Sequence, residues 1–246
     1  MLHWLKRHPV PMAAFFRHVL ALTYAFPPET LAPLLPPSLV LDTWRGKAFL
    51  AVALVQTEQM RLRFLPASWG QAFFLSGYRI FTRLAGAQSL RGLRILRSNT
   101  DRRLMVRLGN LLTHYNYRLC RAEIEERGHD IRCRVLTPRG ELDLDVLAHV
   151  GREAEALPPG SPFVSMAEAR RFAGPLPYTF DFEAETGSII GIRARRQQWN
   201  PRPVAVEVRR MAFLEQEPFR RAAPLLANAF YVHDVPYQWQ RGRRLT

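Results

Sequence analysis

The chain has 246 residues, of which 48% are hydrophobic and 23% are charged. This composition is typical of a folded globular protein and argues against a disordered chain. The formal net charge is +14, from 35 basic and 21 acidic residues, and the only lysines are Lys6 and Lys47. Because alanine, leucine and proline are also abundant, we interpret the arginine excess mainly as compositional bias and rank a functional basic surface second.

Membrane-spanning and secretory segments are not predicted. No apolar run approaches the roughly 18 residues that a membrane helix needs. The N-terminal apolar run is interrupted by Pro9, Pro11 and Arg17, and no small-residue cleavage site follows it. We therefore expect a cytoplasmic protein. The length fits one large β-rich domain over residues 1–246, which can bury a core without disulfides.

Strand patterns dominate the first hundred residues. Residues 48–60 also have helix propensity, but their place between a turn and further strand patterns favours a buried strand. A short helix is expected after Pro28 and ends at Pro36. Gly77 is a candidate bulge position. The predicted strands cover residues 18–26, 38–43, 48–60, 71–84 and 89–98.

Residues 99–126 are the most informative stretch of the chain. A helix is expected to open at Asp101, with Asn99, Thr100 or Asp101 as its cap. A long strand rich in polar aromatic residues is expected from Thr113 to about Glu126. The helix pattern predicts one apolar stripe, formed by Leu104, Leu108, Leu111 and Leu112.

The second half of the chain continues the strand pattern. Two turns join the long strand to strands over residues 131–137 and 142–150, which together predict a β-meander. Ser165 and Glu168 have the spacing of a capping box and predict a helix over residues 165–172. Further strands are expected over residues 178–184, 188–195, 203–214 and within 224–240. The fold prediction is mainly β (α+β): a large, mostly antiparallel barrel or cone with two or three short helices.

The two cysteines, Cys120 and Cys133, fall on adjacent predicted strands. That placement is compatible with a disulfide, but we prefer two reduced, buried thiols. No C-x-x-C or H-x-x-x-H pattern is present, so we predict no metal site. The sequence also lacks a glycine-rich phosphate loop, a dinucleotide fingerprint and a nucleophile elbow. We predict no cofactor.

Several motifs in order give the chain a family resemblance. Residues 31–37 carry the pattern L-x-x-L-L-P-P, residues 41–48 carry L-D-T-x-x-G-x-A, and an arginine-bearing strand surrounds Arg79. This order resembles the uncharacterised YqjF-like bacterial family, closely over residues 15–150 and loosely beyond. That family is similar to the acetoacetate decarboxylase superfamily, and the resemblance implies a large antiparallel β-cone around an interior cavity.

The chain departs from the decarboxylases at their reactive lysine. In the superfamily, a Schiff-base lysine follows the helix-to-strand step in a G-x-P-K-K-like motif, helped by a glutamate on a neighbouring strand. Here His114 or Tyr115 occupies the lysine position, and residues 75–78 before Arg79 contain no glutamate. Lys6 lies in the N-terminal lead-in and Lys47 in a turn. Schiff-base chemistry, which requires an amine of lowered pKa, is therefore not expected.

Alternation along the strand that starts at Thr113 divides its side chains between two faces. His114 and Asn116 share one face, while Tyr115 and Tyr117 share the other, and the sequence does not decide which face lines the cavity. The functional hypothesis makes His114 or Tyr115 an acid or base, with Asn116 and Tyr117 as ligand-binding groups. The structural alternative, with packed tyrosines and a satisfied histidine, ranks first.

Arg79 is the strongest candidate for anion binding. It lies in the middle of a strand, with Phe73, Leu75 and Phe81 on the same face. A buried arginine among aromatic residues requires an anion, which is either a bound carboxylate or an internal partner such as Glu58. Arg94 makes a similar but weaker case. Glu58 is also a candidate general base, although an ion-pair role ranks ahead.

We therefore expect a protein that binds a small anionic or carbonyl-containing molecule inside a barrel. The first alternative is a lysine-independent lyase or hydrolase that uses His114 and Tyr115. The second is a basic protein that binds nucleic acid or another anionic surface, which ranks lower because no basic stripe with interleaved aromatic residues appears. A small-molecule ligand is the expected partner, membrane and nucleic acid are not, and a homo-oligomer stays open.

Overall fold

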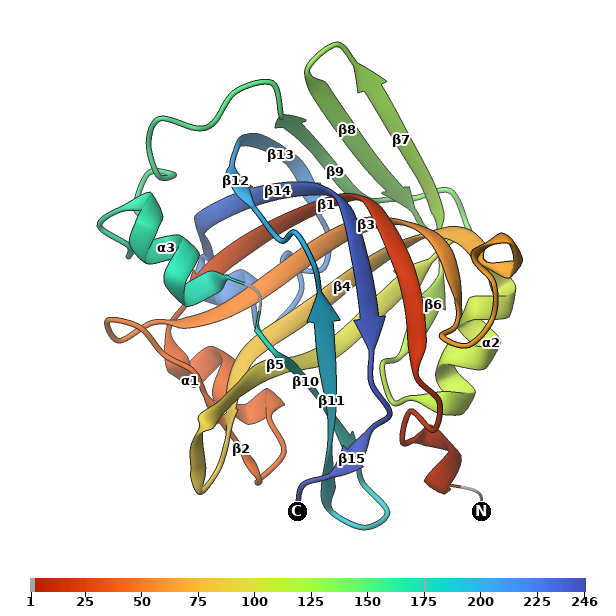
Figure 1. The fold of residues 1–246 in the computed structure, drawn as a ribbon. Helices are drawn as coiled ribbons and strands as arrows, with labels where there is room; N and C mark the ends of the chain where they lie inside the picture. Colours follow the sequence, from red (N-terminus) through yellow and green to blue (C-terminus); the bar gives the residue numbers. More distant parts are fainter. Residues whose placement is uncertain (1–2, 175) are drawn as a thin grey trace.

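The computed structural model describes residues 3–174 and 176–246. Its centre is a closed β-barrel, because strand β14 pairs with β1 on one side and with β11 on the other (Figure 1). In ring order the barrel strands are β14 (Leu225–Trp239), β1 (Met12–Phe26), β3 (Ala48–Leu62), β4 (Gln71–Leu84), β5 (Ala87–Thr100), β10 (Tyr178–Glu183) and β11 (Ser188–Arg196).

The barrel is a mixed sheet rather than a wholly antiparallel one. Strand β10 runs parallel to β5, and so does β6 (Tyr117–Leu119), which pairs with the far end of β5. The other ring neighbours are antiparallel. Three short strands pair along the margins: β2 (Leu39–Leu41), β12 (Arg202–Pro203) and β15 (Arg243–Arg244). The predicted mainly β, mostly antiparallel fold is confirmed, and two of its pairings are parallel.

A second, antiparallel sheet lies across one side of the barrel, at the top of Figure 1. It contains the predicted β-meander, extended by one strand, in the order β13 (Ala205–Met211), β9 (Leu142–His149), β8 (Asp130–Leu136) and β7 (Arg121–Arg127). Buried and partly exposed residues alternate strictly along β8. The main hydrophobic core fills the space between the two sheets, joining residues such as Leu50 and Tyr78 to Val135 and Leu144.

Arg97 of β5 crosses this core. Its side chain is buried, and its guanidinium lies 4.5 Å from the ring centre of Tyr78 and 4.9 Å from that of Phe213. Its Nη2 atom donates a 2.8 Å hydrogen bond to Oδ2 of Asp143 on β9. The arginine therefore ties the barrel wall to the second sheet through two cation–π contacts and one ion pair.

The helices are short and lie outside the barrel. Ser165 caps α3 as predicted, since its Oγ accepts a 3.1 Å hydrogen bond from the Glu168 amide. None of the described helices has the length and hydropathy to cross a membrane. The helices are α1 (Pro28–Leu31), α2 (Arg103–Leu112) and α3 (Met166–Ala173), with 3-10 turns at His3–Lys6, Ala32–Leu34, Ala67–Trp69 and Arg220–Ala222.

The predicted cap of α2 is wrong. The residue before the helix is Arg102, and no side chain caps the first turn. Asp101 instead accepts a 2.9 Å hydrogen bond from the Phe74 amide on β4. The tertiary contact with the barrel has replaced the local cap that the sequence favoured.

The predicted apolar stripe of α2 is only partly buried: Leu104, Leu108 and Leu111 are largely exposed, whereas Leu112 is half-buried. Gly109 is the buried residue of the helix and faces the barrel. A Cβ atom at Gly109 would lie 2.4 Å from the ring of Tyr117, so this close approach requires glycine. Backbone proximity, rather than leucine packing, therefore sets the rotation of the helix.

The single long strand predicted from Thr113 to Glu126 is also wrong, because the chain changes sheets near Cys120. Tyr117 begins β6 in the barrel, and β7 belongs to the second sheet. The Asn110 side chain holds Tyr117 by donating to its carbonyl at 2.9 Å and accepting from its amide at 2.8 Å. Asn116 has a positive φ of 51°, which breaks the alternation before β6.

Two smaller predictions concern Gly77 and the cysteines. The register shift between β4 and β5 falls between Tyr78 and Arg79, so Gly77 is not the bulge. Cys120 and Cys133 are both free and buried, as predicted. Burial raises the pKa of the Cys120 thiol to about 12, so this thiol is protonated at neutral pH.

Candidate ligand cavity

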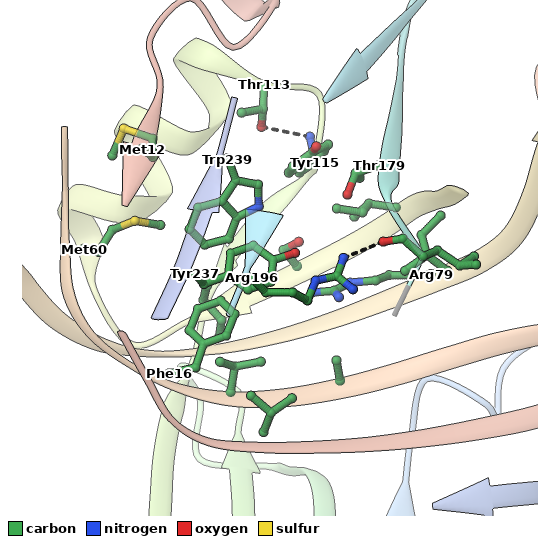
Figure 2. Close-up of a pocket in the computed structure, with 18 of the residues that line it drawn as sticks. Met12, Phe16, Met60, Arg79, Thr113, Tyr115, Thr179, Arg196, Tyr237 and Trp239 are labelled. Atoms are coloured by element: carbon green, nitrogen blue, oxygen red, sulfur yellow. Dashed lines mark hydrogen bonds between the residues drawn. The ribbon is translucent and has the colours of Figure 1, made fainter. Parts of the chain in front are cut away.

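The barrel encloses a cavity of about 460 Å³ (Figure 2). Strand alternation sends apolar side chains inward from several barrel strands, so the walls are largely hydrophobic. Typical wall residues are Phe16, Val19, Val55, Leu75, Ile95 and Phe230. A cavity of this size and lining suits a small organic molecule rather than water alone.

Arg79 of β4 faces this cavity, as Figure 2 shows. It retains some accessible surface although it lies deep in the barrel, because its guanidinium borders the cavity. Its Nε atom is buried and has no hydrogen-bond partner, and no carboxylate in the described part of the chain pairs with it. Burial lowers the pKa of Arg79, but arginine stays charged in proteins. The site thus holds a buried cation that lacks an anion.

A second guanidinium, that of Arg196 at the end of β11, lines the same cavity. Its Nη2 atom donates to the Leu176 carbonyl at 2.5 Å, and the group stacks over Trp199 and Tyr237. Arg196 is close enough to Arg79 to lower the pKa of that residue further. The sequence did not single out Arg196 because the residue lies just beyond the strand predicted over residues 188–195, although strand alternation from Ile192 already pointed it inward.

Three tyrosines border the two arginines: Tyr115, Tyr117 and Tyr237. Burial raises the pKa of Tyr117 to about 12 and that of Tyr115 well above its usual value. Both hydroxyls are therefore protonated at neutral pH and available as donors. The Tyr115 hydroxyl is buried and has no partner in the described structure. These phenols are suited to hydrogen-bond an oxygen of a bound molecule.

A histidine from the N-terminal segment completes the polar part of the lining. The ring of His8 lies 4.7 Å from that of Tyr115, and its Nε2 atom is 3.4 Å from Oδ2 of Asp181 on β10. Asp181 is fully buried and also accepts hydrogen bonds from Arg94 Nη1 at 3.1 Å and from the His114 amide at 2.8 Å. Burial alone would raise the pKa of Asp181, but hydrogen bonds from His114 and the nearby His8 imidazole hold the pKa well below its usual range.

The structure divides the sequence candidates into two groups. Arg79, Tyr115 and Tyr117 lie together in the cavity lining. The other four, which do not line the cavity, are Glu58, Arg94, His114 and Asn116. Arg94 and His114 meet at Asp181, Asn116 is exposed, and Glu58 makes none of the ion pairs found in the described structure. The alternative in which Arg79 pairs with Glu58 is therefore wrong.

Neither of the two lysines lines the cavity. Lys6 lies in the N-terminal 3-10 turn and Lys47 in the turn before β3. Among the described residues that line the cavity, none therefore carries an amine that could form a Schiff base. Within residues 3–174 and 176–246, no group of three or more metal-ligating side chains forms a cluster.

The fold is similar to that of acetoacetate decarboxylase-like proteins of known structure. The acetoacetate decarboxylase of Legionella pneumophila superposes with a TM-score of 0.67 at 10% identity, covering 97% of this chain and 88% of that one. The enduracididine biosynthesis enzyme MppR gives a TM-score of 0.67 at 13% identity, with 97% and 90% covered. An acetoacetate decarboxylase-like enzyme from Sphingomonas wittichii RW1 gives 0.61 at 14% identity, with 96% and 92% covered.

The sequence itself matches the family DUF2071, described as an uncharacterized conserved protein, over residues 13–236. The chain belongs to this family. No curated protein matches the sequence. The predicted membership of an uncharacterised family with the acetoacetate decarboxylase-like fold is thereby confirmed. Because the solved structures are only 10–14% identical in sequence, their similarity to this chain concerns the fold alone.

Proposed function

We propose that the protein binds a small oxo acid, a molecule with a carboxylate and a ketone, inside the barrel. One observation carries the proposal: Arg79 is a buried cation that faces a cavity and has no anionic partner among the described residues. An unpaired buried charge is costly, and a bound carboxylate would neutralise it with two parallel hydrogen bonds. Arg196 beside it adds to the demand for negative charge.

The rest of the cavity favours a ligand with both polar and apolar parts. The tyrosine hydroxyls are donors placed near the arginines, which suits a carbonyl oxygen. The remaining wall is apolar and suits a short hydrocarbon body. Two structural relatives support the class by name, since one is an acetoacetate decarboxylase and MppR has been solved with pyruvate. Acetoacetate and pyruvate are both small oxo acids.

The proposal is tested by titrating purified protein with pyruvate, acetoacetate, 2-oxobutyrate and 4-methyl-2-oxopentanoate, and with their methyl esters. We expect the acids to raise the melting temperature and to bind with a measurable dissociation constant, and the esters to bind more weakly. Arg79→Met should weaken acid binding by about 30-fold or more, which corresponds to at least 2 kcal/mol. Calorimetry supplies the constants.

Arg118→Met is the matched control, because Arg118 is exposed. This variant should bind the acids as the wild type does. We also expect the ligand-free Arg79→Met protein to melt no lower than the wild type, since the substitution removes an unpaired buried charge. If no acid stabilises the wild type, or if Arg79→Met responds to every acid unchanged, the proposed function is wrong.

Gly77→Ala should weaken the same binding without removing the charge. Gly77 and Arg79 share a strand face, and a Cβ atom at Gly77 would lie 2.7 Å from Nε of Arg79. The methyl group must displace the guanidinium, so we expect about a tenfold loss of affinity, or roughly 1.4 kcal/mol. In the Arg79→Met background the substitution should cause no further loss.

The control for Gly77→Ala is Ser76→Ala on the opposite strand face, whose hydroxyl has no hydrogen-bond partner in the described structure. An unchanged dissociation constant for Gly77→Ala would show that the guanidinium position does not govern binding. Isothermal titration with the best acid of the panel decides between these outcomes. It compares Gly77→Ala, Ser76→Ala, Arg79→Met and the double variant Gly77→Ala/Arg79→Met.

A further inference from the structure

We propose that His8 is a general base that removes a proton from the carbon beside the ketone of the bound oxo acid. This inference rests on the proposed function and adds a reaction to it. It assigns a role to a residue of the N-terminal segment, which no sequence motif singled out. The arrangement of His8, Asp181 and Tyr115 in one wall of the cavity carries the inference.

The first step concerns the position of His8. Its backbone amide donates to the Leu112 carbonyl at 3.1 Å, and its carbonyl accepts from the Gly242 amide at 3.0 Å. The preceding Arg7 forms two hydrogen bonds, of 2.8 and 2.6 Å, with the fully buried Glu183. Contacts to three distant parts of the chain therefore fix one histidine at the cavity.

The backbone of His8 is also in an unfavourable conformation. Its φ is +50°, in the left-handed region that non-glycine residues seldom adopt. Such strain persists only where the surroundings enforce it, and it concentrates at functional sites. Here the enforced conformation places the imidazole against Tyr115 and Asp181 rather than in solvent.

The second step concerns the two ring nitrogens. Nε2 is buried and lies 3.4 Å from Oδ2 of Asp181, within ion-pair range but without the geometry of a regular hydrogen bond. A carboxylate at this place favours a proton on Nε2 and leaves the lone pair of Nδ1 available to a ligand. The carboxylate also stabilises the imidazolium that forms once Nδ1 takes a proton. Asp181 is thus a positioning residue for His8.

The third step concerns the oxygen of the ketone. Tyr115 contacts His8 on one side and is close enough to Arg79 on the other to interact with its charge. Its buried, unpartnered hydroxyl is a donor in reach of the space between the two groups. A hydrogen bond from this phenol would stabilise the negative charge that develops on the oxygen during proton removal.

The reaction balances without a cofactor. Nδ1 of His8 takes the proton, the C–H electron pair becomes the carbon–carbon double bond of the enolate, and the carbonyl π pair moves to the oxygen. Return of a proton from His8 to the same carbon regenerates the oxo acid. In heavy water the returned atom is deuterium, so the net change is one C–H replaced by one C–D.

The test follows 2-oxobutyrate in heavy water by proton NMR and measures loss of its C3 signal. We expect wild-type protein to accelerate the exchange in proportion to its concentration. His8→Asn should lower the exchange rate at saturating ligand by about 100-fold or more while the dissociation constant stays the same. Asparagine is chosen because it tolerates the left-handed conformation of residue 8.

His233→Asn is the control, since His233 is exposed and does not line the cavity. It should retain the wild-type exchange rate. Asp181→Asn should lower the rate at saturation, and adding Asp181→Asn to His8→Asn should lower the rate no further than His8→Asn alone, a non-additivity that general destabilisation would not produce.

The outcomes separate the two proposals. If the wild type binds 2-oxobutyrate through Arg79 but does not exchange its protons, or if His8→Asn exchanges at the wild-type rate, the base role of His8 is wrong and the binding function stands. If His114→Asn abolishes exchange and His8→Asn does not, the base is His114, the other histidine at Asp181, and the role proposed for His8 is wrong. If nothing in the oxo acid panel binds, the proposed function itself has failed.

Discussion

Arg97→Ala is expected to lower the free energy of unfolding by about 3–5 kcal/mol. The substitution leaves the largely buried Asp143 carboxylate without its cation and removes the guanidinium from between the Tyr78 and Phe213 rings. In a chain of this size the loss should lower the melting temperature by about 10 °C. Urea unfolding followed by circular dichroism measures the difference directly.

The matched control is Arg121→Ala, because Arg121 forms an ion pair with Glu123 while its side chain is 75% exposed. It should change the unfolding free energy by no more than about 0.5 kcal/mol. In an Asp143→Asn background, Arg97→Ala should cost clearly less than in the wild type. Equal costs for Arg97→Ala and Arg121→Ala would mean that the buried ion pair does not join the two sheets.

A second large effect is expected at alkaline pH, where the protein should unfold between about pH 9 and pH 12. Burial raises the pKa of Tyr78, Tyr117 and Cys120 to about 12, from 10.0 for the tyrosines and 9.0 for the cysteine. Groups with a raised pKa hold their proton more tightly in the folded protein. The stability they contribute is complete below the unfolded pKa values and is lost as the pH rises toward 12.

The size of this effect follows from the shifts. A pKa raised from 10.0 to about 12 corresponds to roughly 3 kcal/mol for each tyrosine, and one raised from 9.0 to about 12 to roughly 4 kcal/mol for Cys120. A few such groups therefore match the whole stability of an ordinary domain, about 5–15 kcal/mol. We therefore expect the ultraviolet absorbance of tyrosinate and the loss of near-ultraviolet circular dichroism to rise together along the pH titration. Complete tyrosine ionisation in a protein that keeps its native dichroism would contradict the burial of these side chains.

Strand periodicity accounts for much of what the sequence predicted correctly. The sequence puts Arg79 on one strand face with Leu75 and Phe81, because side chains two residues apart in a strand point to the same side. All three line the cavity. The capping box of Ser165 and the buried strand after Lys47 were predicted from similarly local patterns. These features depend on neighbours within a few residues, which a sequence displays directly.

The failures share a different physical origin. The sequence separated His114 from Tyr115 by face, but the inward face depends on how β6 meets β5 and how α2 packs on Tyr117. His8 carried no periodic signal, because its place depends on the contact between Arg7 and Glu183, which lie 176 residues apart in the chain. Long-range contacts of this kind override local propensity and leave no local pattern.

The closure of the barrel by β14 has a consequence for how the protein is made. The ring needs residues 225–239 to pair with both β1 and β11, so it cannot close until nearly all of the described chain has left the ribosome. Until then β1 and β11 each present an unpaired edge, which invites association with other nascent chains. Such long-range pairing also slows folding. We expect recovery of the native protein from denaturant to depend steeply on protein concentration, with fast dilution favouring the closed ring.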